Sequence, residues 1–293
     1  MAVLTAQGIS SLAIELLTRT LVLPMTASRI PGAEFSGSNG DTITVRVPQP
    51  STARTQSSPG ATITYDDVDE VPVDVSLSHL YHAKLVSDQE LSLDLADFGR
   101  QITRVQVAAV ATGAENQMAT VMNGLPADLT IDADGGNIDA IVLQAREMLG
   151  RAEAPLDGRY LAVSPEVATF ILALDEVSRV DASGDTNALR NAIIARWRGF
   201  NVVESTGLDA GKAAAYHRSG FAFANRVPVV PRGVTSSATA QSGGVGMRQI
   251  FQYVPDKLSD ASVISTFAGA AVVTDAESGE TTPRVVVMDT AES

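Results

Sequence analysis

Two segments of alternating sequence constrain what this chain can fold into more than any other feature. In residues 42–47, and again in residues 71–77, Val, Ile or Leu alternates with polar residues or proline, which is the period-two pattern of a β-strand. Residues 48–70 between them are polar and loop-like, so the two strands can pair as one long hairpin. A two-stranded ribbon with open edges and little apolar cover is marginal in water. The pattern therefore predicts that another molecule lies against this hairpin.

The composition predicts a globular protein with an acidic surface. The chain has 293 residues, 45% of them hydrophobic, and its 34 Asp and Glu against 21 Lys and Arg give a net charge of −13. This charge opposes affinity for nucleic acid through its phosphates. The longest apolar run is far shorter than the roughly 18 residues that suggest a membrane span, and the absence of cysteine excludes disulfides and thiolate chemistry. We expect no membrane contact, no targeting segment and no sequence-specific binding of nucleic acid.

The first part of the chain predicts an arm and one long helix. Residues 7–20 have the spacing of a short amphipathic helix, and a linker rich in Ser, Gly and Pro follows. Ser87 opens a capping-box signature, and the apolar spacing after it predicts a helix over residues 88–123, roughly 54 Å long. Gly99 and Gly113 lower the local helix propensity, so they are the expected positions of any bend or break.

Shorter units follow, and the whole pattern predicts an α+β fold. We predict helices over residues 138–149 and 188–198, and a further helix that begins directly after Ser164, which serves as its cap. Strands are predicted over residues 160–163, 200–203, 221–224, 247–253, 262–267, 270–274 and 284–288. Residues 233–246 are predicted to form an exposed loop.

No catalytic site is visible in the sequence. Gly207 to Lys212 superficially resembles a phosphate-binding loop, but the glycines are too close together and alanine follows the lysine where Ser or Thr must bind magnesium. His79 and His82 are three apart on an expected strand, which places them on opposite faces and makes them poor co-ligands. His217 is isolated, and no serine lies in a nucleophile elbow. We predict no catalytic residue, no cofactor and no metal.

Two acidic segments invite comparison with cation sites. Residues 132–136 resemble the start of a calcium loop, but glycine occupies the third ligand position, which favours a polar turn before a helix. The run Asp66, Asp67, Asp69 and Glu70 is better interpreted as a solvated acidic loop, or as a surface that meets arginines of a neighbouring molecule.

The parts occur in the order arm, long hairpin, long helix, compact α/β unit and strand-rich ending. In this order, and especially in residues 41–48, 188–205, 221–226 and 260–273, the chain resembles the major capsid proteins of tailed bacteriophages, the Hong Kong 97-type fold. The similarity covers nearly the whole chain and is greatest to the coat-protein branch typified by Salmonella phage coat. Residues 188–205 resemble the helix and strand of the axial domain of that fold.

The resemblance implies a structural protein, not an enzyme. Such proteins self-assemble as pentamers and hexamers into the icosahedral head shell of a tailed phage, which encloses double-stranded DNA without sequence-specific binding. The expected location is the virion, and the host cytoplasm during assembly. Portal and decoration proteins are further expected partners. The implied division is residues 1–40 as the N-terminal arm, 41–86 as the extended loop, 87–125 as the peripheral domain with its spine helix, 126–224 as the axial domain and 225–293 as the return to the peripheral domain with the C-terminal strands.

Three departures from the family refine these expectations. Some relatives begin with a long scaffolding region, but the hairpin here starts by Asp41, so a separate scaffolding protein is expected. Others carry an inserted domain, for which residues 233–246 are too few. In certain members a lysine of the extended loop forms an isopeptide bond with an asparagine. Residues 41–77 contain no lysine, so we predict a shell without that cross-link.

Contacts between copies are predicted in the hairpin. Arg46 and Arg54 are expected to meet acidic surface on the next copy, in exposed pairs worth up to about 1 kcal/mol each. The spine helix, bending at Gly99 or Gly113, is the expected site of strain during shell expansion. Two other classes stay open: an encapsulin-like compartment of the same fold that encloses an enzyme, and a soluble α+β binding or hydrolase domain, which would need a convergent polar site.

Overall fold

The computed structural model describes residues 21–29, 42–48, 53–56, 58–60, 62–65, 70–87, 102–174, 193–234, 236–242, 245–273 and 284–290. The helices are α2 (Leu23–Thr26), α4 (Arg104–Asn123), α5 (Ile138–Arg151) and α6 (Pro165–Leu172), with 3-10 turns η4 (Arg218–Gly220) and η5 (Pro255–Lys257). The strands are β1 (Ser28–Arg29), β2 (Thr42–Pro48), β3 (Glu70–Ser76), β4 (Ser78–Ser87), β5 (Leu129–Ile131), β6 (Arg159–Val163), β7 (Ile193–Trp197), β8 (Phe200–Glu204), β9 (Ala213–His217), β10 (Phe221–Arg226), β11 (Ser236–Ser242), β12 (Val245–Val254), β13 (Ser259–Val272) and β14 (Val285–Thr290).

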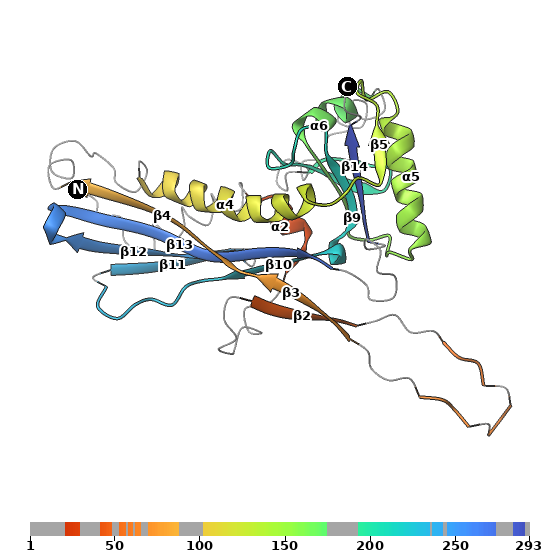
Figure 1. Cartoon of the computed structure of the whole chain (residues 1–293), viewed down its shortest axis with the longest axis horizontal. Helices are drawn as coiled ribbons and strands as arrows, with labels where there is room; N and C mark the ends of the chain where they lie inside the picture. Colours follow the sequence, from red (N-terminus) through yellow and green to blue (C-terminus); the bar gives the residue numbers. More distant parts are fainter. Residues whose placement is uncertain are drawn as a thin grey trace.

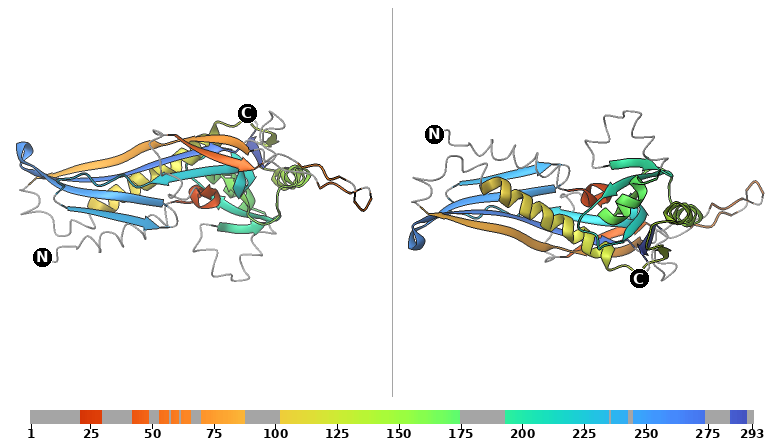
Figure 2. Two further views of the ribbon diagram at one scale, coloured as in Figure 1. Left: turned by 90° about the horizontal axis from the view of Figure 1, so that it is seen from below. Right: turned by 90° about the horizontal axis from the view of Figure 1, so that it is seen from above.

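A long, mainly antiparallel sheet forms the elongated half of the molecule. Its strand order is β1-β10-β13-β12-β11, and β4 pairs with β13 as well. Helix α4 lies along one face of this sheet (Figure 1, Figure 2). The apolar side chains of α4 recur every three or four residues and so form one buried face. They are Val107, Val110, Ala111, Ala114, Met118, Ala119 and Met122.

A mixed sheet in the order β5-β14-β9-β6-β8-β7 forms the compact half, with α5 and α6 beside it (Figure 1). Its central strand β9 is buried on both faces. Ala213 and Ala215 belong to the core shared with α5 and α6, whereas Ala214 and Tyr216 belong to the core shared with α4 and the first sheet. Burial on both faces explains why this strand has no polar alternation.

The strongest local patterns are confirmed. Strands β2 and β3 pair antiparallel with Ile43 opposite Val75, which is the expected hairpin. Helix α4 ends at Asn123 as predicted and continues through Gly113 without a break. The Ser164 hydroxyl accepts a hydrogen bond from the amide of Val167, so it caps α6 as expected. Helix α5 and strands β6, β8, β10, β12 and β14 also form close to their predicted bounds.

The predicted helix over residues 188–198 is wrong in its described part. Residues 193–197 form strand β7, which pairs antiparallel with β8. The two residues between the strands, Arg198 and Gly199, have φ values of 49° and 86°, and positive φ at both positions is typical of the tight turn that joins a twisted hairpin. Pairing with β8 therefore overrode the helical spacing of this segment.

Two expectations for the last third also need correction. The strands predicted over residues 262–267 and 270–274 are one continuous strand, β13, which passes through Gly269. The loop predicted over residues 233–246 contains strand β11, which pairs with β12. The residues of β11 are small and polar, so the ladder to its neighbour, and not an apolar pattern, makes it a strand.

Some predicted elements lie outside the described residues. They are the amphipathic helix over residues 7–20, the first part of the long helix up to residue 101 with Gly99, and residues 188–192. Strands β1, β5 and β9 were not predicted, because each is very short or consists mostly of alanine.

Candidate assembly surfaces

The hairpin of β2 and β3 continues into an arm that projects away from both sheets (Figure 1). Every described residue of its outer part, at positions 53–56, 58–60 and 62–65, is exposed. Two large apolar side chains are among them: Ile63 is 55% exposed and Tyr65 is 84% exposed. Exposed apolar side chains at the end of a projecting ribbon are typical of a surface that another molecule covers.

The root of the arm is fixed to the body by apolar packing. Val73 and Val75 on β3 are buried against Ala222 and Ala224 of β10, and Val273 completes this small core. The arm is therefore held at its base by its own chain, while its outer part is left open.

Arg46 and Glu70, two of the residues predicted to contact neighbouring copies, meet each other in the described part of the chain. The Arg46 guanidinium lies 3.3 Å from the Glu70 carboxylate across the β2–β3 ladder, in an exposed pair. Arg54 lies in the exposed outer part of the arm. Asp66, Asp67 and Asp69 lie outside the described residues. Arg46 and Glu70 thus pair within one copy.

A buried carboxylate joins the N-terminal segment to the body. Glu115 on α4 accepts hydrogen bonds from the backbone amides of Val22 and Leu23 at 3.0–3.1 Å and from the Ser205 hydroxyl at 2.9 Å. Burial raises the pKa of Glu115, and these hydrogen bonds partly offset the increase. Sequence reasoning missed this residue, although a carboxylate in the apolar stripe of the helix is a detectable signal.

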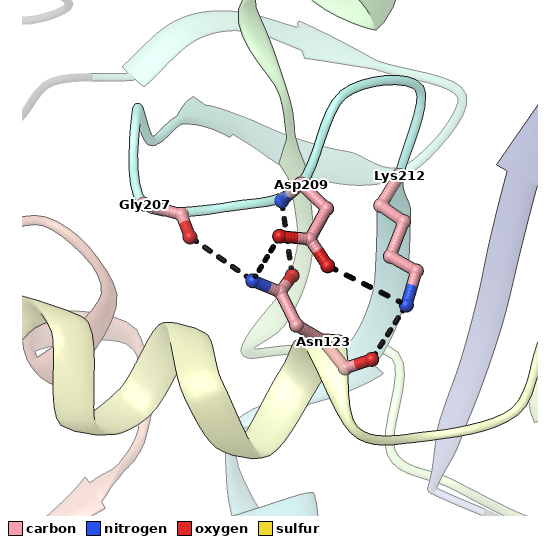
Figure 3. Close-up of polar contacts among 4 residues, drawn as sticks. All are labelled: Asn123, Gly207, Asp209 and Lys212. Carbon is pink, nitrogen blue, oxygen red and sulfur yellow. Dashed lines mark hydrogen bonds and ion pairs between the residues drawn. The ribbon is translucent and has the colours of Figure 1, made fainter.

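A second polar joint ties the end of α4 to the compact half (Figure 3). The Asn123 amide nitrogen donates to the Gly207 carbonyl at 3.1 Å and to the Asp209 carboxylate at 3.0 Å, and its amide oxygen accepts from the Asp209 backbone amide at 3.1 Å. The Lys212 ammonium donates to the Asn123 backbone carbonyl at 2.5 Å. The segment that superficially resembled a phosphate loop is therefore a structural clasp for the helix end.

The residues that the sequence only superficially suggested as ligand or metal sites have structural roles. His79 and His82 both lie on β4 at positions of opposite face, and the His79 ring packs 4.6 Å from the ring of Phe267. In the turn before α5, the Asp134 carboxylate accepts from the backbone amide of Gly136 at 3.0 Å. Within the ranges that the structure describes, no three His, Asp or Glu side chains form a group suited to a metal ion. None of the described helices is both long and apolar enough to span a bilayer.

Comparison with known proteins identifies the fold. The capsid of Ralstonia phage GP4 superposes with a TM-score of 0.64 at 11% identity, covering 92% of this chain and 87% of that one. Mycobacterium phage Che8 gives a TM-score of 0.59 at 22% identity, with 92% and 90% covered. A virus-like particle from Pyrococcus furiosus gives 0.56 at 13% identity, with 97% and 98% covered. No family model and no curated protein matches the sequence.

These similarities extend over almost the full length of both partners in each pair. The chain therefore has the Hong Kong 97-type capsid fold, an α+β architecture, as the resemblance in sequence implied. Because the identities are low, the shared property is the fold itself.

Proposed function

We propose that this chain is a major capsid protein, which self-assembles as pentamers and hexamers into the icosahedral head shell that encloses the double-stranded DNA of a tailed phage. One observation carries the proposal beyond the fold: the β2–β3 arm projects with its outer residues exposed (Figure 1). An arm that its own chain leaves open is explained if a neighbouring copy covers it.

Apolar contact is the larger source of affinity in such an assembly. Covering an exposed Ile63 or Tyr65 removes apolar area from water and is worth about 1.5–3 kcal/mol per fully buried side chain. An exposed ion pair made by Arg54 is worth at most about 1 kcal/mol and weakens with salt. The charged residues of the β2–β3 arm would then contribute more to the specificity of the contact than to its affinity. These residues include Arg46, Asp66, Asp67, Asp69 and Glu70.

The finer features of this function belong to the same proposal. Residues 126–224 would form most of the axial domain, except that β10 pairs in the long sheet and β14 adds a strand to the compact sheet. Residues 1–40 would form the N-terminal arm, residues 41–86 the extended loop, and residues 87–125 with most of 225–293 the peripheral domain. A separate scaffolding protein, a portal protein and decoration proteins are the proposed partners. The protein would act in the virion, after assembly in the host cytoplasm. The net charge of −13 would keep enclosed DNA mobile against the wall.

Negative-stain microscopy of the protein, expressed alone and together with a candidate scaffolding protein, tests the proposal. We expect closed shells, or pentameric and hexameric rings. A double substitution, Ile63→Ser and Tyr65→Ser, should prevent closed shells while leaving the circular dichroism spectrum of the subunit unchanged, because both side chains are exposed in the single chain. A monodisperse monomer under both expression conditions would contradict the proposed function.

An encapsulin-like shell around an enzyme is the second candidate, because the structural superposition with a virus-like particle from Pyrococcus furiosus covers 97% of this chain. The contents of particles purified from the native source distinguish the two. Packaged double-stranded DNA supports the phage capsid, and an enclosed protein without DNA supports the compartment.

Mature particles should also release intact monomers on a denaturing gel. The hairpin contains no lysine between residues 41 and 77, so it cannot supply the amine of an isopeptide bond. A ladder of covalent oligomers would contradict this expectation.

A further inference from the structure

Basic side chains from several elements meet at one end of the compact sheet. Strand β9 lies between β14 and β6 in this sheet. His217 on β9 pairs with Arg159 on β6, and the His217 backbone amide donates to the carbonyl of Arg284, directly before β14, at 3.0 Å. Arg218 opens η4 directly after β9, and Arg29 ends β1. We refer to Arg29, Arg159, His217, Arg218 and Arg284 as the basic cluster.

Hydrogen bonds hold several members of the cluster in place. The Ser219 hydroxyl lies 2.7 Å from Nδ1 of His217 and accepts from the Arg284 guanidinium at 3.1 Å. The guanidinium of Arg159 is almost fully buried and donates to the backbone carbonyls of residues 154 and 155 at 2.6 and 2.9 Å. The Arg159 charge is therefore held by neutral backbone carbonyls.

Within the described part of the chain, neither Arg29 nor Arg218 lies within ion-pair distance of a carboxylate. Burial and the nearby charge of Arg218 lower the pKa of Arg29. Burial, together with Arg284 and further arginines, lowers the pKa of His217, although a hydrogen bond with the Asp157 backbone opposes this change. Like charges held together repel one another, and a bound anion would relieve that repulsion.

We propose that the basic cluster is a docking surface for carboxylate side chains of a second copy of this chain, an inference that rests on the proposed self-assembly. The chain has 34 acidic against 21 basic residues, so contact between two copies is repulsive unless positive groups lie in the interface. Arg218 is exposed and Arg29 is half-buried, so both can reach a partner. Planar guanidinium groups match carboxylates with two parallel hydrogen bonds.

A zero-length carbodiimide cross-link identifies the partner directly. The reagent activates a carboxylate, an amine in contact with it then forms an amide, and the reagent leaves as a urea. The native chain has only Lys84, Lys212 and Lys257 as lysines, and arginine does not react, so the variant Arg218→Lys adds one amine at the cluster. In shells assembled from mixed heavy-isotope and normal copies, we expect new cross-links between residue 218 and an Asp or Glu of another copy. Shells that form but give no such inter-copy link would overturn the proposal.

Charge reversal gives an independent test with a matched control. Arg218→Glu and Arg232→Glu make the same change in net charge, and both arginines are exposed. Arg218→Glu should raise the protein concentration needed for assembly about tenfold more than the control, with a smaller difference at high salt. Arg218→Gln should give an intermediate value. Equal effects of the two reversals would overturn the proposal.

The same variants separate this inference from the function on which it rests. A wild-type protein that never assembles would refute the proposed function and the docking surface together. Normal assembly of Arg218→Glu, combined with loss of a double-stranded DNA gel shift that the wild type shows, would assign the cluster to phosphate and not to a second copy.

Discussion

The backbone carbonyl oxygen of Ser76 lies 2.1 Å from the position that a Cβ atom on Gly269 would occupy. Gly269 is within β13, and Ser76 ends β3 where the arm joins the first sheet. Only a residue without a side chain allows the two backbones to approach so closely. The direction in which the arm leaves the body therefore depends on this glycine.

Gly269→Ala should displace the root of the arm. Because a methyl group has no space beside the Ser76 carbonyl, the backbone must shift, and we expect the free energy of unfolding to fall by about 1–3 kcal/mol. Urea denaturation measures this change. Gly150→Ala is the control, since no atom lies within 4 Å of its added Cβ and alanine favours the helix by up to about 1 kcal/mol. Equal stability of the two variants would show that the contact is not restrictive.

The hydrogen bonds between the Asn123 side chain and the loop of Gly207 and Asp209 should stabilise that loop measurably. Asn123→Ala removes three side-chain hydrogen bonds to Gly207 and Asp209, and we expect a loss of about 1–3 kcal/mol. Hydrogen exchange of the amides in residues 207–212 should become faster. Asn116→Ala, at an exposed position of the same helix, should change stability by no more than about 0.5 kcal/mol. Unchanged exchange in Asn123→Ala would contradict the assigned role.

The buried Glu115 should make stability depend on pH. Its pKa is raised above the usual 4.5 by burial, so above pH 4.5 the folded protein keeps a proton that the unfolded chain has released. Stability must then fall as the pH rises through the interval between the unfolded and folded pKa values, and must level off above it.

Glu115→Gln removes this titration. Urea unfolding of the unassembled protein from pH 4.5 upward measures the effect. The difference in unfolding free energy between the variant and wild type should shift in favour of the variant as the pH rises. A constant difference caused by the altered hydrogen bonds would not change this trend. Glu147→Gln, an exposed position on α5, should retain the wild-type dependence because Glu115 is still present. Parallel pH curves for wild type and Glu115→Gln would refute this assignment.

Thr26 and Tyr216 should be energetically coupled. Their hydroxyl oxygens are 2.5 Å apart in the core, and burial raises the pKa of the Tyr216 phenol, so it stays protonated and can donate. Tyr216→Phe removes the hydrogen bond between the two hydroxyls, whereas Thr26→Val also removes the bond from the Thr26 hydroxyl to the Leu23 carbonyl. Each substitution should cost about 1–3 kcal/mol. The double variant should cost less than their sum. Additive losses would show that the hydroxyls act independently.

The features that the sequence determined by itself are those with a local period or a local stop signal. Residues 42–47 and 71–77 specify a hairpin because alternate side chains of a strand point to opposite faces. Helix α4 follows the apolar spacing up to Asn123, and α6 begins after Ser164 because a hydroxyl satisfies a free amide at the helix end. The capsid resemblance followed from the order of such elements, and the comparison of folds agrees with it.

Contacts between residues distant in the sequence decided the rest. Residues 193–197 form a strand because β8 offers backbone hydrogen bonds to them. Strand β11 has no apolar alternation from which the sequence could predict it. Glu115 meets Val22 across more than ninety positions, and Arg29 and Arg218 become neighbours only when two sheets are assembled. A residue's charge can be read from the chain, but the free energy of holding it beside another depends on their distance and burial, which only the tertiary structure sets.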